Sequence, residues 1–100
     1  MVKGKTKSGI KFQIDERIKE DARFLYYLNK LGKPSDDLQE TSSTLMGMIE
    51  LIFGKEEGVI NFMNEVANAH GGICSGENMF AELREILEKV NAKNSLPSPK

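Results

Sequence analysis

Apolar and polar residues alternate near the start of the chain. Residues 10–14, Ile-Lys-Phe-Gln-Ile, have the period of two that predicts a strand with one buried face. Ser8-Gly9 favours a turn before this strand, so residues 2–6 are expected to pair back with it as a hairpin. Because an isolated hairpin is only marginally stable, a helix should cover its apolar face.

Helical spacing of apolar residues begins directly after the strand. A first helix is expected over residues 16–31, with Asp15 as its N-cap and Gly-Lys-Pro at 32–34 as its end signal. Residues 35–37, Ser-Asp-Asp, offer new N-caps for a second helix that ends at Gly54.

Two further helices complete the pattern. The third is expected to start near residues 55–57 and to end at Gly71-Gly72, and the fourth to follow Ser75 or Gly76. The fourth carries one apolar stripe, with Glu82 among the polar residues placed outside it. The predicted fold is therefore mainly α, with about four helices and a short N-terminal β-strand or hairpin.

The length of 100 residues fits one domain. We expect a single helical domain over residues 1–92, with its β element at about 1–14. Residues 93–100 contain two prolines and no periodicity, so they are expected to form a flexible tail.

The second helix has more apolar surface than one face can hold. Leu45, Ile49 and Ile52 share a face, while several large apolar residues fall outside it. The helix is therefore expected to be packed from two sides, either at the centre of the monomer or partly exposed to a partner. With a second stripe on the first helix, the candidate partner-binding residues are Phe24, Tyr27, Leu31, Met46, Met48, Leu51 and Phe53.

Charge and composition exclude several function classes. The chain has 14 basic and 15 acidic residues and a net charge of −1, so no global field attracts nucleic acid or an anionic membrane, and neither is expected as a partner. No stretch approaches the roughly 20 apolar residues that span a bilayer, and no signal peptide is indicated. A lone cysteine fits a reducing compartment, so the expected location is the cytoplasm.

One local cluster departs from this balance. Lys3, Lys5, Lys7 and Lys11 fall within the predicted hairpin, where lysines commonly prevent strand pairing between chains. The alternative is nucleic-acid binding, with the asparagine face of the third helix as a reading surface, although that face has no Arg or Lys to hold phosphates.

The chain shows no constellation that would make it an enzyme. His70 and Cys74 supply two zinc ligands where a closed structural site needs four, so no metal or cofactor is expected. His70 is interpreted as a last-turn histidine that caps carbonyls or packs on the core. Asp36-Asp37 fits helix capping, and Ser42-Ser43 lies inside a helix with no matching base.

The order of these features resembles the tail assembly chaperones of long-tailed phages and prophages of Gram-positive bacteria. The resemblance covers about residues 9–95 and rests on four segments: Gly9–Arg17 at the strand and helix start, Asp21–Leu28, Leu51–Glu57 and Glu82–Glu88. The match lies in the order of these segments and in the chain length.

This resemblance implies a non-catalytic role in the cytoplasm of the bacterial host. Such chaperones keep the tape measure protein soluble until tail tube subunits polymerise around it. They tend to self-associate, and many occur beside a longer, frameshifted form. A client helix is expected in a groove walled by the first two helices, so aspartate at Met48 or Phe53 should weaken client binding or self-association. The alternative function is a small helical DNA-binding or regulatory protein of a mobile element.

Overall fold

The expected N-terminal hairpin is present. In the computed structural model, which describes residues 1–33 and 37–94, strands β1 (Val2–Lys5) and β2 (Lys11–Ile14) are antiparallel, with Val2 opposite Ile14. The turn closes through the Gly9 N–H, which donates to the Thr6 carbonyl over 2.9 Å. The alternation therefore correctly predicted which side of the ribbon is buried.

Helices form the rest of the described chain. A 3₁₀ helix, η1 (Glu16–Glu20), precedes four α-helices in the described residues: α1 (Ala22–Gly32), α2 (Leu38–Phe53), α3 (Glu57–Ala69) and α4 (Gly76–Asn94). This confirms the mainly α fold with an N-terminal hairpin.

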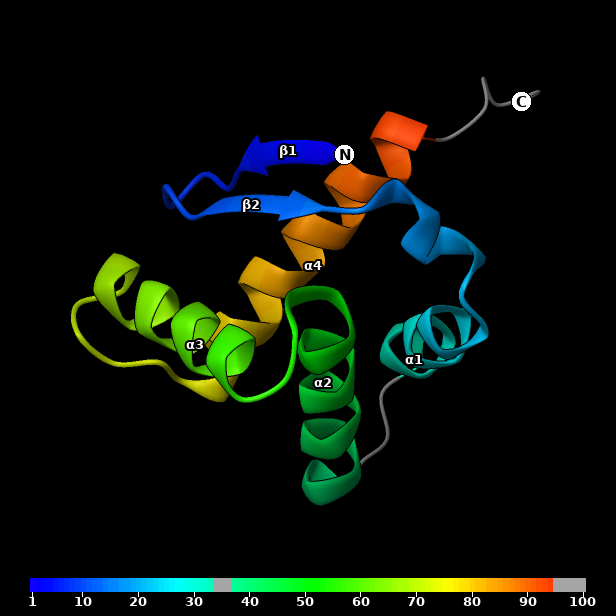
Figure 1. Ribbon diagram of the computed structural model, residues 1–100. Coiled ribbons are helices and arrows are strands. Elements are labelled where there is room, and N and C mark those ends of the chain that lie inside the picture. Colours follow the sequence, from blue (N-terminus) through cyan, green and yellow to red (C-terminus); the bar gives the residue numbers. More distant parts are fainter. Residues whose placement is uncertain (34–36, 95–100) are drawn as a thin grey trace.

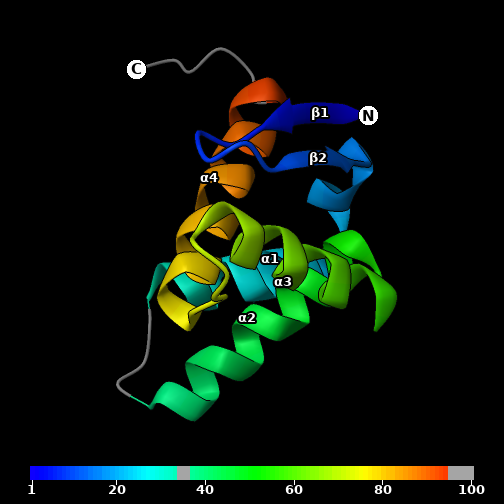
Figure 2. The same ribbon diagram turned by 90° about the vertical axis from the view of Figure 1, so that its left-hand side faces the viewer.

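The hairpin lies as a small layer over α4, and the helices form the second layer (Figures 1 and 2). Its inward side chains join one hydrophobic core with residues of all four α-helices. Helix α2 lies at the centre of the helical layer and packs against α1, α3 and α4. Of the apolar residues outside its main face, Met48 is buried in the core, while Met46, Leu51 and Phe53 are half-buried against it.

The first predicted helix is interrupted. Residues 16–31 do not form one continuous helix, because Asp21 takes an extended conformation (φ −79°, ψ 126°) and its side chain accepts the Arg23 N–H over 2.8 Å. Asp15 caps η1 in the same way, accepting the Arg17 N–H over 2.9 Å. Each Asp also pairs with the arginine two residues on, so a repeated Asp-x-Arg cap produces two short helices.

Helices α1 and α2 are in direct contact. A Cβ on Gly47 would lie 2.7 Å from the Tyr27 ring, so the glycine lets the ring lie against the α2 backbone. A recess of about 30 Å³ lies along this pair of helices, between residues that include Leu31 and Thr44.

The ends of the helices agree with the predictions to within a few residues. Asp37 caps α2 through the Gln39 N–H at 3.0 Å, while Ser35 and Asp36 lie outside the described residues. Helix α4 continues through Asn94, two residues beyond the predicted domain end at 92. The rest of the expected tail, residues 95–100, lies outside the described residues.

Candidate functional site

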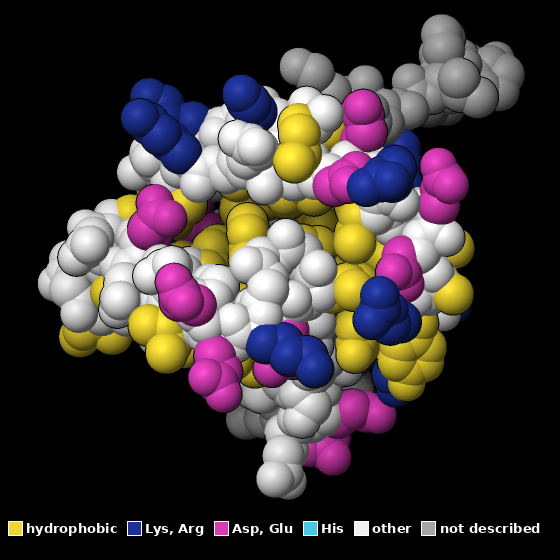
Figure 3. Space-filling view, viewed as in Figure 1, with side chains coloured by type: hydrophobic (Ala, Val, Ile, Leu, Met, Phe, Trp, Pro, Cys, Tyr) yellow, Lys and Arg dark blue, Asp and Glu magenta, His cyan; other side chains and the backbone are white. Residues whose placement is uncertain are grey.

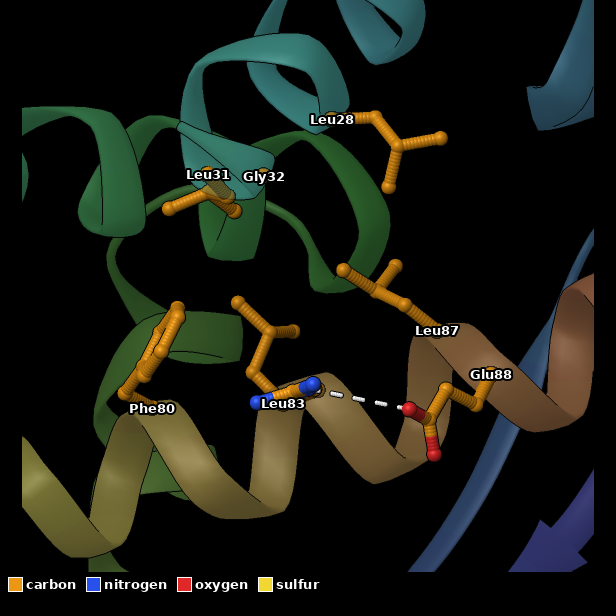
Figure 4. A pocket seen from close by; sticks show the side chains of 8 residues that line it. Leu28, Leu31, Gly32, Phe80, Leu83, Leu87 and Glu88 are labelled. Atoms are coloured by element: carbon orange, nitrogen blue, oxygen red, sulfur yellow. Dashed lines mark ion pairs between the residues drawn. The ribbon is translucent and has the colours of Figure 1, made fainter. Parts of the chain in front are cut away.

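An apolar groove of about 320 Å³ runs between α1 and α4. Leu28 and Leu31 extend from α1 toward α4, and Phe80, Leu83 and Leu87 extend from α4 toward α1 (Figure 4). The α4 residues follow the spacing i, i+3, i+7, which places them on one side of the helix. The two helices thus face each other with apolar side chains between them.

The groove has a buried floor and half-exposed walls. Leu83, Leu87 and Leu31 are almost fully buried, with 0%, 7% and 8% of their surfaces exposed, so they belong to the core as well. Leu28 and Phe80 are half-buried and leave apolar area open to solvent. A ligand that covered these two side chains would gain about 25 cal/mol for each Å² of apolar surface removed from water.

One rim of the groove is charged. Arg84 and Glu88 form an ion pair at 3.6 Å on the exposed side of α4, shown by the dashed line in Figure 4. At the end of α1 the groove is open, because a Cβ on Gly32 would meet no atom within 4 Å. An apolar floor with a charged rim suits the apolar stripe of an amphipathic helix.

Exposed apolar side chains continue this surface along α1. Leu25 lies one turn before Leu28 and is 54% exposed, and Tyr26 is 59% exposed. Figure 3 shows hydrophobic side chains gathered over α1, on the right of the view. Helix α1 therefore offers apolar area both inside the groove and outside it.

The seven candidate partner-binding residues divide into two groups. Phe24, Leu31 and Met48 are buried in the core, with exposures of 2%, 8% and 0%. The other four are half-buried against that core: Tyr27, Met46, Leu51 and Phe53. Of the seven, Leu31 also lines the α1–α4 groove.

The expected groove between the first two helices is not the apolar groove of the structure. Contact of Tyr27 with Gly47 closes the α1–α2 side, and the opening lies on the other side of α1, facing α4. Sequence reasoning missed Leu28, Phe80 and Leu87 as site residues. The sequence of α4 could have indicated them, because Phe80 and Leu87 lie at one flank of its apolar stripe, where burial by neighbouring helices is least complete.

A buried carboxylate lies at the opposite flank of the same stripe. Glu82, which the sequence pattern had placed on the polar side, is only 4% exposed. Its Oε2 lies 2.6 Å from Nε2 of His70, at the end of α3. His70 was expected to cap carbonyls or to pack on the core, so this partner was not foreseen.

Glu82 connects three elements. Its Oε1 is buried without a donor at hydrogen-bond geometry, although the hydroxyls of Thr6 and Ser8 in the hairpin turn lie close enough to act on the carboxylate. Burial alone would raise the pKa of Glu82, but Ser8, His70 and Thr6 together hold this pKa below its ordinary value. The backbone N–H of Lys7 donates to Glu85 over 2.8 Å, so two carboxylates of α4 hold the turn.

Acid should therefore release the hairpin turn from α4. Because the folded-state pKa of Glu82 lies below the ordinary 4.5, its stabilising contribution is complete above that pH and is lost as the pH falls through the folded value. Between about pH 5 and pH 3, we expect the free energy of unfolding to fall less steeply in the Glu82→Gln variant than in the wild type. Urea unfolding at several pH values measures this.

Asp15 and Asp21 also contribute to the pH dependence of stability in that experiment. The side-chain and backbone hydrogen bonds of Arg17 and Arg23 lower the pKa values of these two exposed carboxyls to about 2. Their titration is the same in wild type and in Glu82→Gln. Equal slopes for the two proteins would show that Glu82 contributes nothing to acid sensitivity.

The structure gives no support to a nucleophilic cysteine or to a metal site among the described residues. Burial raises the pKa of the Cys74 thiol, which disfavours the nucleophilic thiolate. Within residues 1–33 and 37–94, no three His, Cys, Asp or Glu side chains are grouped closely enough to hold a metal ion. In the same residues, no helix is both long and apolar enough to cross a membrane.

Comparison of the chain with known protein families, with curated proteins and with solved structures finds no match. The functional assignment therefore depends on the α1–α4 groove and on the resemblance of the sequence segments.

Proposed function

We propose that this chain is a non-catalytic tail assembly chaperone of a long-tailed bacteriophage or prophage. In this proposal it binds an amphipathic helical segment of the tape measure protein in the α1–α4 groove. Binding covers the apolar stripe of the client and keeps the client soluble in the bacterial cytoplasm until tail tube subunits polymerise around it. The observation that carries the proposal is the groove itself, with leucines on both walls and a charged rim.

The dimensions of the groove suit a helix better than a small molecule. The α4 wall runs from Phe80 to Leu87, a distance of about 10 Å or two helical turns. The walls are open to solvent along the rim and at Gly32, so a long segment can enter from the side. An amphipathic helix laid there would contact α1 and α4 as a third helix, through residues at i, i+3 and i+7.

The exposed apolar residues of α1 support self-association and contact with a longer form. Leu25 and Tyr26 lie outside the groove, so they remain available while a client helix occupies it. In the proposal, copies of the chain assemble along α1 and present several grooves to one long client. A client with many apolar segments would then be held with an avidity greater than that of a single groove.

Leu28→Asp should abolish most of the client binding without unfolding the chain. Leu28 is half-buried at the groove wall, so the substitution places a charge against the apolar stripe of the client at modest cost to the core. We expect the Kd for tape measure fragments to rise tenfold or more, since covering a leucine contributes about 1.5–3 kcal/mol. Co-purification of tagged fragments, followed by titration, measures the effect.

Ile60→Asp is the matched control. Ile60 is 53% exposed on α3 and does not line the groove, so the same change of chemistry should leave client binding unaltered. Thermal unfolding of both variants establishes that they are folded. If folded Leu28→Asp still co-purifies with the client at the wild-type yield, the α1–α4 groove is not the client site.

A further inference from the structure

The hairpin concentrates positive charge that the overall composition conceals. Residues 1–14 contain four lysines and no Asp or Glu, while the whole chain carries −1, so residues 15–100 carry −5. The expectation that nucleic acid is not a partner rested on the near-zero total. The net charge of the whole chain does not show that its positive and negative residues lie in different places in the fold.

The register of the hairpin directs these lysines to one face. Val2, Phe12 and Ile14 are buried toward the helices, whereas the alternating residues Lys3, Lys5 and Lys11 are exposed. Lys5 lies directly opposite Lys11, and Lys3 lies opposite Gln13. Lys7 is exposed in the turn beyond them. We call Lys3, Lys5, Lys7 and Lys11 the lysine face; dark blue side chains are visible over the hairpin at the top left of Figure 3.

The spacing on this face is close. Alternate residues of a strand lie about 7 Å apart, and side chains opposite each other across an antiparallel pair lie about 5 Å apart at Cβ. Directly opposed like charges destabilise a two-stranded ribbon. The Lys5–Lys11 pair is therefore unfavourable for the hairpin alone, and an anion lying over the two ammonium groups would relieve their repulsion.

Glu77, Glu85 and Glu88 line a surface hollow together with Lys7, but the lysine face makes no ion pair with them. Within the described part of the chain, none of its four ammonium groups is within ion-pair distance of a carboxylate. Glu85, next to the turn, accepts the backbone N–H of Lys7 and lies 4.0 Å from Lys89 instead. Glu16 lies 3.6 Å from the Met1 amine. The charge of the lysine face is thus directed at solvent.

We propose that the lysine face binds the phosphate backbone of double-stranded nucleic acid without reading its sequence. A duplex presents one phosphate for about every 1.7 Å of its axis, so one ribbon of lysines can contact several, and the released counterions favour binding. The outward residues of the ribbon include no aromatic side chain for base stacking. Apart from Met1, which is 63% exposed just before the first strand, they include no large apolar side chain for membrane insertion, which favours nucleic acid over a lipid surface.

This inference is independent of the client groove. The lysine face and the groove share no residue, and each can fail without the other. A protein with both surfaces would hold a protein client through apolar contacts and a phosphate backbone through charge.

The test uses the full chain and a fluorescein-labelled 25-base-pair DNA duplex of arbitrary sequence, followed by anisotropy. We expect binding that weakens on the order of 100-fold between 50 and 200 mM NaCl, as three to four phosphate contacts require. A second duplex of unrelated sequence should bind with an affinity within about twofold, because phosphate contacts carry no sequence information.

Two double variants separate the lysine face from total charge. Lys5→Glu/Lys11→Glu should weaken duplex binding at 50 mM NaCl by more than tenfold. Lys33→Glu/Lys55→Glu changes net charge equally at exposed positions elsewhere and should retain most of the affinity. If the first variant does not fold by circular dichroism, Lys5→Gln/Lys11→Gln replaces it, with a smaller loss in the same direction.

Three results would overturn the proposal. The first is the absence of binding at 50 mM NaCl, and the second is an equal loss of affinity in both double variants. The third is tighter binding to phosphatidylserine-containing vesicles than to the duplex at the same salt concentration, which would assign the lysine face to a membrane surface.

Discussion

Met48→Asp is expected to unfold the chain. Met48 is completely buried on α2, the helix that packs against α1, α3 and α4. Removing a buried methionine side chain costs about 2–5 kcal/mol, and an unpaired carboxylate in its place adds a desolvation cost. Since a domain of this size is stable by about 5–15 kcal/mol, we expect a poorly cooperative or absent thermal transition.

Met48→Leu is the control, because a swap of similar volume in a core usually costs less than about 1.5 kcal/mol. Circular dichroism and urea unfolding compare the two variants. A Met48→Asp protein of wild-type stability would mean that Met48 belongs to an interface, as one sequence-based interpretation allowed. The weakened client binding expected from that interpretation would then become testable at this residue.

Gly58→Ala should destabilise the chain by about 2–3 kcal/mol, although alanine is the better helix former. Only residues 54–56 separate α2 from α3, and a Cβ on Gly58 would overlap the backbone carbonyl of Phe53. A backbone atom cannot move aside as a flexible side chain can, so the turn between the helices must open. We expect the melting temperature to fall by roughly 10–20 °C.

Gly32→Ala is expected to have the opposite effect on stability. Gly32 is also helical, but a Cβ there meets open space, so the substitution should stabilise the chain by about 0.4–1 kcal/mol. Thermal unfolding of the two variants measures the difference in sign. Similar effects of both substitutions would contradict the close approach of Gly58 to Phe53.

The sequence pattern predicted those elements that depend on interactions between residues close together in the chain. Alternation over residues 10–14 placed the strand and its buried face, because the period of two fixes which side chains share a side. The break at Asp21 also had a local signal, since Asp21 and Arg23 repeat the Asp15–Arg17 pair. That signal was overridden by the continuous helical spacing of the apolar residues around it.

The site depended on contacts between distant segments. Glu82 is polar and lies on the flank of an apolar stripe, so only the proximity of His70 and of the hairpin turn explains its burial. Tyr27 packs on Gly47 of α2, and on the side of α1 that faces α4, Leu28 and Phe80 remain half-buried and line the groove. Helical periodicity identifies an apolar flank, but it does not determine which neighbour covers that flank.

Backbone amide NMR shifts during titration with a tape measure fragment test the client groove most directly. We expect the largest shift changes on Leu28, Leu31 and Gly32 of α1 and on residues 80–88 of α4. Ile60 on α3 should change little. Shift changes concentrated on α3 and the second half of α2, with the α1 and α4 walls unaffected, would show that the client binds elsewhere than in the α1–α4 groove.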